Sequence, residues 1–245
     1  MKNKVVRISN VTRTYFMGKV EVNALRGINL DVEKGEFVSI MGPSGCGKST
    51  LMHIVGCLDR PSTGHVHLDE VDVDELDDNS LAEIRNKKVG FVFQTFNLLP
   101  KLNAIENVEL PLIYAGVGFD ERRQKAAKLL ETVGLKDRMF HKPSELSGGQ
   151  SQRVAIARSL ANDPSIIMAD EPTGNLDSKS GEEIIHLFMD LNVKGITLII
   201  VTHDEEIANH SKRIVRLKDG LVVSDSAVPQ MSEAERHNGN NNHHA

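Results

Sequence analysis

The fold is decided by one glycine-rich stretch, Gly42-Pro43-Ser44-Gly45-Cys46-Gly47-Lys48-Ser49-Thr50. It follows the apolar run FVSIM (37–41) and precedes LMHIVGCL (51–58), so it joins a predicted strand to a predicted helix. Its glycines permit the backbone angles that turn successive N–H groups inward, and the helix adds the positive end of its dipole. The stretch therefore predicts a P-loop that holds phosphate groups.

Two side chains of this loop suit a nucleotide that carries Mg²⁺. Lys48 can reach the β- and γ-phosphates, and the Ser49 hydroxyl can bind the metal ion. The alternative is a glycine-rich turn that only resembles a P-loop. Because the strand, the loop and the helix follow one another in the required order, the P-loop interpretation is favoured.

Three later runs predict the central strands of a parallel sheet covered on both faces. They are VGFVF (89–93), IIMA (166–169) and LIIVT (198–202), and they are followed by Gln94, by Asp170 and Glu171, and by His203. Ligands bind at the carboxyl ends of parallel strands, so these side chains are expected to face one nucleotide. There Asp170 suits a contact to Mg²⁺ and Glu171 a base that activates water. A solvated strand exit is the alternative for Asp170-Glu171.

The remaining segments complete an α/β plan. Residues 5–15 and 22–32 alternate apolar and polar positions, which predicts antiparallel strands before the P-loop. Residues 65–73 are predicted as one strand, 77–86 as a short helix, 104–162 as mostly helical and 181–193 as a helix. Residues 214–225 are predicted as a hairpin around Asp219-Gly220.

These elements predict a P-loop NTPase with a RecA-like core. One ATPase domain is expected over residues 1–230, with 1–94 and 163–230 forming the core and an N-terminal antiparallel β subdomain. Residues 95–162 are expected to form an inserted α-helical subdomain. The polar tail 231–245 is expected to be disordered, and its His237, His243 and His244 to be solvated rather than metal ligands.

Composition narrows the class of function. The net charge is −5, from 29 Lys+Arg against 34 Asp+Glu, which argues against a nucleic-acid partner. Two cysteines, Cys46 and Cys57, form neither a disulfide framework nor a zinc motif, so a reducing, cytoplasmic compartment is expected. The polar start of the sequence offers no apolar run that could serve as a signal peptide, so none is expected, and no apolar run comes near the ~18 residues that cross a bilayer. At a membrane, the chain would have to dock on a protein that spans it.

A second glycine-rich helix start, Leu146-Ser147-Gly148-Gly149-Gln150, identifies the family. Together with the P-loop and Asp170-Glu171, it resembles the ATP-binding-cassette (ABC) family over residues 5–225. The resemblance implies an ATPase that uses Mg²⁺. It implies that Tyr15 stacks on adenine, that Gln94 contacts Mg²⁺ and senses the transporter, that Glu171 is the catalytic base and that His203 contacts the γ-phosphate.

The resemblance also implies a head-to-tail pair of two copies that holds two ATP molecules. Ser147, Gly148, Gly149 and Gln150 would touch the nucleotide bound by the other subunit, and Asp177 would lie in the loop that crosses to it. Ser151 departs from the family pattern, because many relatives carry Gln there. It lies outside the glycine-rich turn.

Residues 56–64, 84–112 and 169–178 resemble a particular branch, the lipoprotein-release and macrolide-export ATPases (LolD-like and MacB-like), with cell-division FtsE-like proteins nearby. Members of this branch pair with permeases. The chain is therefore expected on the inner face of the cell membrane, attached through a permease. Its docking surface is predicted just after Gln94, at the apolar cluster of Phe96, Leu98 and Leu99.

Two other classes are disfavoured. ABC ATPases that act on nucleic acid carry a long coiled coil, zinc-binding cysteines or two cassettes in tandem, whereas here only 98 residues separate Lys48 from Ser147. P-loop kinases and GTPases lack the LSGGQ stretch, and GTPases carry an Asn-Lys-x-Asp motif that is missing here. The cargo and the direction of transport are not encoded in motifs of this chain.

Overall fold

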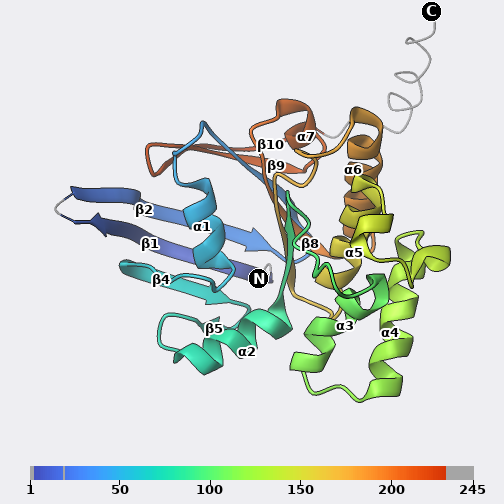
Figure 1. Cartoon of the computed structure of the whole chain (residues 1–245). Helices are drawn as coiled ribbons and strands as arrows, with labels where there is room; N and C mark the ends of the chain where they lie inside the picture. The colour runs from blue at the N-terminus through green and yellow to red at the C-terminus, as the bar shows by residue number, and fades with distance from the viewer. Residues whose placement is uncertain (1–2, 19, 230–245) are drawn as a thin grey trace, which may run out of the picture.

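The computed structural model describes residues 3–18 and 20–229, which form two β-sheets and the helices around them (Figure 1). The predicted disordered tail, with its three histidines, lies outside the described residues. Within them, no helix combines the length and the apolar character needed to cross a membrane.

The larger sheet carries the strands that the apolar runs predict. Its strand order is β10-β9-β3-β8-β7-β6, and β3, β6, β7, β8 and β9 are parallel. Every side chain of β3 and β8 is buried, which fits central strands covered on both faces. The antiparallel hairpin at Asp219-Gly220 is also confirmed. The strands are β3 (Phe37–Met41), β6 (Val89–Phe93), β7 (Ile166–Asp170), β8 (Thr197–Val201), β9 (Arg213–Lys218) and β10 (Leu221–Ala227).

The smaller sheet is antiparallel, with the order β2-β1-β4-β5. One sequence-based expectation was wrong here: residues 65–73 are two strands rather than one. Asp69 takes a positive φ of 53°, so the chain turns and β5 pairs back on β4, with Asp72 opposite His67. The strands are β1 (Lys4–Met17), β2 (Val20–Glu33), β4 (Thr63–Leu68) and β5 (Val71–Asp72).

The hydrophobic core between the two sheets contains one face of α1 (Lys48–Val55), which buries Leu51, Met52, Ile54 and Val55. The predicted helices α2 (Asp78–Lys88) and α6 (Ser178–Val193) are present. A short helix, α7 (Glu205–Asn209), was not predicted; Asp204 caps its first turn. Because α1 is anchored on its apolar face, its N-terminus is held at the carboxyl end of β3.

The region 104–162 is helical in three parts, α3 (Ala104–Tyr114), α4 (Phe119–Thr132) and α5 (Gly148–Ser159). Two short 3-10 turns, Lys136–Arg138 and Pro143–Glu145, interrupt the expected helical run. Figure 1 shows α3 and α4 to one side of the larger sheet, with α5 between them and its strands and α6 above α5. The helices share a single core cluster with β6, β7 and α6, so the division into subdomains stays a prediction.

Candidate functional site

The P-loop leaves β3 and enters α1, as its motif requires. Gly47 caps α1 with φ 105°, and no side chain bonds the helix's first turn, so its N–H groups can face a ligand. The Lys48 Nζ atom donates to the carbonyls of Gly42 (2.6 Å) and Pro43 (3.0 Å), which folds the ammonium group over the loop. Cys46 is 3% exposed and belongs to the core, and its Sγ atom lies 2.6 Å from the position that a Cβ atom of Gly42 would take.

Glu171 stands at the end of β7 and is held by the end of β8. Its Oε1 atom accepts hydrogen bonds from the His203 backbone N–H (3.0 Å) and the His203 Nδ1 atom (2.7 Å), and its Oε2 atom accepts from the Thr202 hydroxyl (3.2 Å). The hydrogen bond with Glu171, and then its negative charge, raise the pKa of His203. Two of the predicted catalytic side chains, Glu171 and His203, are therefore joined directly by a hydrogen bond.

Asp170 precedes Glu171 and is half-buried. Burial, and then the charge of Glu171, raise the pKa of the Asp170 carboxyl, while the charges of His53 and Lys48 act in the opposite direction. A carboxylate destabilised in this way is stabilised by a bound cation. With Ser49 and Gln94, Asp170 offers the oxygen ligands that Mg²⁺ prefers, so the residues present fit a magnesium ion.

Gln94, at the end of β6, contacts the loop that precedes α6. Its Nε2 atom donates to the Asn175 Oδ1 atom (3.2 Å), and the Asn175 side chain donates to the Gln94 carbonyl (3.1 Å). Gly174 is essential to this contact, because a Cβ atom there would lie 2.6 Å from the Gln94 Nε2 atom. Two hydrogen bonds therefore link the loop after β6 to the loop before α6.

The second glycine-rich turn packs against the loop that precedes α6 and not against the P-loop. Ser147 and Gln150 form a capping box at the start of α5. A Cβ atom at Gly148 would lie 3.1 Å from Leu176, so the turn packs against the residues just before α6. Asp177 caps α6 through Ser180. Among the described residues, no hydrogen bond or ion pair joins this turn to the P-loop.

Tyr15, the residue expected to stack on adenine, lies on β1. Its hydroxyl donates to the Asp59 Oδ2 atom (2.8 Å), and the Arg13 guanidinium covers one face of the ring at 4.6 Å from the centroid. Arg13 also pairs with Asp59 (2.8 Å). These contacts hold the ring in one orientation.

Sequence reasoning missed Gln152. This fully buried side chain of α5 donates to the carbonyls of Phe93 (3.3 Å) and Pro172 (2.5 Å), next to Gln94 and Glu171. It ties the helix that starts at the second glycine-rich turn to the ends of β6 and β7. The sequence signal is weak, because a glutamine in a polar helix start is usually solvent-exposed.

The residues predicted to dock a partner are mostly turned inward. Leu98 packs against the core, and the Phe96 ring lies beside the position that a Cβ atom of Gly148 would take. Leu99 is exposed (48%). Phe96 and Asn97 have positive φ values of 60° and 51°, and the Arg158 guanidinium bonds both of their carbonyls.

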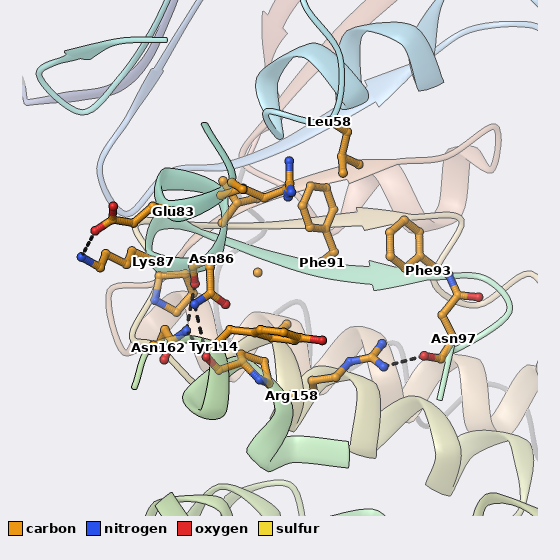
Figure 2. A pocket seen from close by; sticks show the side chains of 18 residues that line it. Leu58, Glu83, Asn86, Lys87, Phe91, Phe93, Asn97, Tyr114, Arg158 and Asn162 are labelled. Carbon is orange, nitrogen blue, oxygen red and sulfur yellow. Dashed lines mark hydrogen bonds and ion pairs between the residues drawn. The ribbon is translucent and has the colours of Figure 1, made fainter. Parts of the chain in front are cut away.

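A groove of about 910 Å³ opens beside this segment. Figure 2 shows Phe91 and Phe93 of β6 along it, with Leu58 above and Tyr114 of α3 below. Arg158 and Asn97 close one end, and Tyr114 is 81% exposed. None of Phe96, Leu98 and Leu99 lines this groove.

Comparison with known proteins gives the family. A family model described as "ABC transporter" matches residues 25–174. An uncharacterized ABC transporter ATP-binding protein of Thermotoga maritima is 57% identical over 89% of this chain and 94% of its own length. The macrolide export ATP-binding/permease protein MacB of Bdellovibrio bacteriovorus is 53% identical over 94% of this chain, which spans only 35% of that protein.

A solved structure shares the whole fold. The ATP-binding cassette MJ0796, from Methanocaldococcus jannaschii, has a dimeric structure in a post-hydrolysis state bound to ADP and Pi. It is 51% identical to this chain, covers 92% of it and is itself covered in full, with a TM-score of 0.84.

Proposed function

Because this chain belongs to the ABC transporter family and is an ATP-hydrolysing cassette, we propose that two copies of it together drive a membrane permease of the export type. The observation that carries the proposal is the Glu171 carboxylate, which hydrogen bonds from Thr202 and His203 hold in place. It stands beside Asp170 at the end of β7, and the charge of Lys48 acts on both Asp170 and His203. Phosphate binding and water activation would therefore share one edge of the sheet.

Each side chain of this edge has a separate task in the proposed reaction. Glu171 accepts the proton of the attacking water, and its bonds to His203 and Thr202 keep the carboxylate aimed. Lys48 balances phosphate charge, and His203, with its ring mostly exposed, donates to the γ-phosphate. Mg²⁺, held by Ser49, Gln94 and Asp170, would neutralise part of the phosphate charge when bound.

The second copy would complete the site. The start of α5 offers exposed N–H groups and has no acidic residue in its first turn, which suits a phosphate. Because no hydrogen bond or ion pair within residues 3–18 and 20–229 joins this turn to the P-loop of its own chain, the residues Ser147–Gln150 can serve the nucleotide of a partner copy, with Asp177 at the crossing loop. The dimeric structure of the cassette MJ0796 supports this arrangement.

Substitution of Glu171 tests both the reaction and the pairing. We expect Glu171→Gln to bind ATP but to hydrolyse it ~10²–10⁴-fold more slowly, since a general base contributes about this factor. ATP then stays between two copies, and mass action favours the dimer. Size exclusion with light scattering should show a dimer in ATP and a monomer without it.

The matched control is Glu182→Gln, which neutralises an exposed carboxylate on α6. It should turn over ATP at the wild-type rate and show no trapped dimer. A Glu171→Gln chain that stays monomeric in saturating ATP would refute the shared site. Wild-type hydrolysis by the same variant would instead refute the assignment of the base.

The permease is proposed to dock at the groove beside residues 96–99. Phe91 and Phe93 stack with ring centroids 5.6 Å apart and are only partly buried, and Tyr114 and Leu58 expose apolar surface next to them. A short helix with a few apolar anchors fits such a groove. Two lining residues connect the groove to the nucleotide site. Phe93 directly precedes Gln94, and Asn97 lies in the loop that follows it. Docked in this way, the chain would lie on the cytoplasmic face of the membrane.

A further inference from the structure

Two histidines, outside the motifs of the nucleotide site, share the outer face of the smaller sheet. His65 and His67 are two positions apart on β4, while the alternate residues Val66 and Leu68 are buried at 1% exposure. Because side chains of a strand alternate between its faces, both imidazoles point away from the core. They form a His-x-His pair on a rigid strand.

The turn at Asp69 brings two carboxylates to the same place. Asp72 lies opposite His67 across the β4–β5 ladder, and Asp74 follows two residues later. The His65 Nδ1 atom is 3.5 Å from the Asp74 Oδ2 atom and 4.0 Å from the Asp72 Oδ2 atom. The His67 Nε2 atom is 3.7 Å from the same Asp72 oxygen. The ligand atoms of His65, Asp72 and Asp74 lie within 4.8 Å of one another.

Within the described residues, the imidazoles lie at ion-pair distance from the carboxylates but make no hydrogen bonds to them. The Oδ1 atom of Asp74 is buried and has no hydrogen-bond partner, while its Oδ2 atom accepts from the Val66 N–H (2.8 Å). The Asp72 Oδ1 atom accepts from the Asp74 N–H (3.1 Å), so both carboxylates are fixed by backbone. Burial, and the negative charge of Asp72, raise the pKa of Asp74.

We propose that His65, His67, Asp72 and Asp74 form a binding site for a divalent transition-metal cation of the zinc class. In a tetrahedral zinc site the bonds are about 2.0–2.2 Å long, which places neighbouring ligand atoms roughly 3.3–3.6 Å apart. The His65–Asp74 separation of 3.5 Å matches that spacing, and the separations of Asp72 from His67 (3.7 Å) and from His65 (4.0 Å) are slightly longer. His65, Asp72 and Asp74 form the converging group, and His67 joins it through Asp72. Two imidazoles favour Zn²⁺, Ni²⁺ or Cu²⁺ over Mg²⁺ or Ca²⁺, which prefer oxygen ligands throughout.

The position of the site gives it a structural effect. Its ligands come from β4, from β5 and from Asp74 just after β5. A bound ion would therefore join the two arms of a short hairpin that is held by two ladder pairs and by the Val73 N–H bond to the Val66 carbonyl (3.0 Å). The ion would stabilise this sheet against unfolding, and the stabilisation would grow with the logarithm of the free ion concentration once that exceeds the Kd. Arg7 lies opposite His67 on β1, and its positive charge lowers the affinity.

Calorimetry with ZnCl₂ on the nucleotide-free, chelator-treated chain tests the site. His237, His243 and His244 are first replaced by Ala so that the tail contributes no ligand. One Zn²⁺ per chain is expected, with a rise in Tm. The pair His65→Ala and His67→Ala, and separately Asp72→Asn, should weaken binding at least about tenfold, because loss of even an outer contact to a metal ligand costs this much.

The matched control is His186→Ala, which removes an imidazole on α6 and should leave zinc binding unchanged. Metal-free variants should keep the wild-type circular dichroism and ATP turnover, and Asp72→Asn serves if the double histidine variant does not fold. The proposal is overturned if the tail-substituted chain binds no Zn²⁺, if binding survives the double substitution, or if millimolar Mg²⁺ displaces Zn²⁺.

Discussion

Glu171 has a backbone conformation that few residues other than glycine adopt, with φ 43°. Such a conformation costs about 1–3 kcal/mol and persists only where surrounding contacts hold it. The contacts here are the Glu171 N–H bond to the Val201 carbonyl (2.9 Å) and the bonds of its carboxylate to Thr202 and His203. At the scale of the residue, these contacts stabilise a strained backbone conformation, and that conformation sets the direction of the Glu171 carboxylate.

The coupling of His203 to Glu171 predicts a pH effect. Because the folded-state pKa of His203 is raised, the charged pair is complete below the ordinary histidine pKa and is lost as pH rises through the raised value. In Glu171→Gln the pKa of His203 should fall, since the carboxylate charge that raised it is gone.

Proton NMR titration of the imidazole signals measures this shift. The signals of the other histidines serve as internal controls and should titrate as in the wild type. An unchanged His203 titration in the variant would show that another group raises its pKa.

At the scale of the element, one buried amide holds the segment between β6 and α3. Asn107 of α3 is fully buried; its Oδ1 atom accepts from the Leu99 N–H (2.8 Å). Its Nδ2 atom donates to the carbonyls of Leu99 (3.2 Å), Leu102 (3.1 Å) and Asn103 (3.0 Å). The exposed Leu99 side chain is therefore displayed from a rigid turn rather than from a loose loop.

Asn107→Leu should destabilise the chain by about 1–3 kcal/mol, because it leaves the Leu99 N–H without its buried partner. Urea unfolding followed by circular dichroism measures the change. The control is Asn103→Asp, which keeps an acceptor at the helix cap and should be nearly neutral. If Asn107→Leu costs no more than this control, the turn does not depend on the buried amide.

At the scale of the molecule, the groove lies where three parts meet: β6 of the larger sheet, α2, and the helices α3 and α5. Arg158 joins the groove to the strained residues Phe96 and Asn97, and burial lowers the pKa of its guanidinium. Gln152, two turns earlier on the same helix, reaches the carbonyl of Phe93. An occupant of the groove would therefore act on α5 and on the loop after β6 together.

Tyr114→Asp should weaken capture of the permease from detergent-solubilised membranes while basal ATP turnover stays near the wild-type rate. A charge on the exposed rim of an apolar groove must be desolvated when a helix docks there. The capture is measured by mass spectrometry of membrane-spanning proteins retained on the immobilised chain.

Phe140→Asp is the matched control, because Phe140 is 70% exposed but does not line the groove. It should retain the permease. Leu99→Asp separates the two candidate surfaces: if it abolishes capture and Tyr114→Asp does not, the partner docks on residues 96–99 rather than in the groove.

Much of the fold followed from local pattern. The P-loop, the buried strands and the α/β order need only glycine spacing and runs of apolar residues, because these act over a few positions of the chain. The parallel strands then bring Gln94, Asp170, Glu171 and His203 to one edge. The one strand predicted over 65–73 was wrong because Asp69 takes a positive φ; aspartate is enriched in that conformation, but Asp69 lacks the following glycine that marks the hairpin at Asp219-Gly220.

The sequence by itself determined that this chain binds a nucleotide and belongs to the ABC family, since the motifs carry both. Only the tertiary structure decided which other side chains hold the residues of these motifs in position. Gln152 reaches two strand ends, Asn175 bonds Gln94, and the imidazole of His65 meets Asp74 across a hairpin, although no spacing along the chain marks these pairs. The physical reason is that packing brings together residues from distant segments, and burial then selects the polar groups that are bonded and those left open to a ligand.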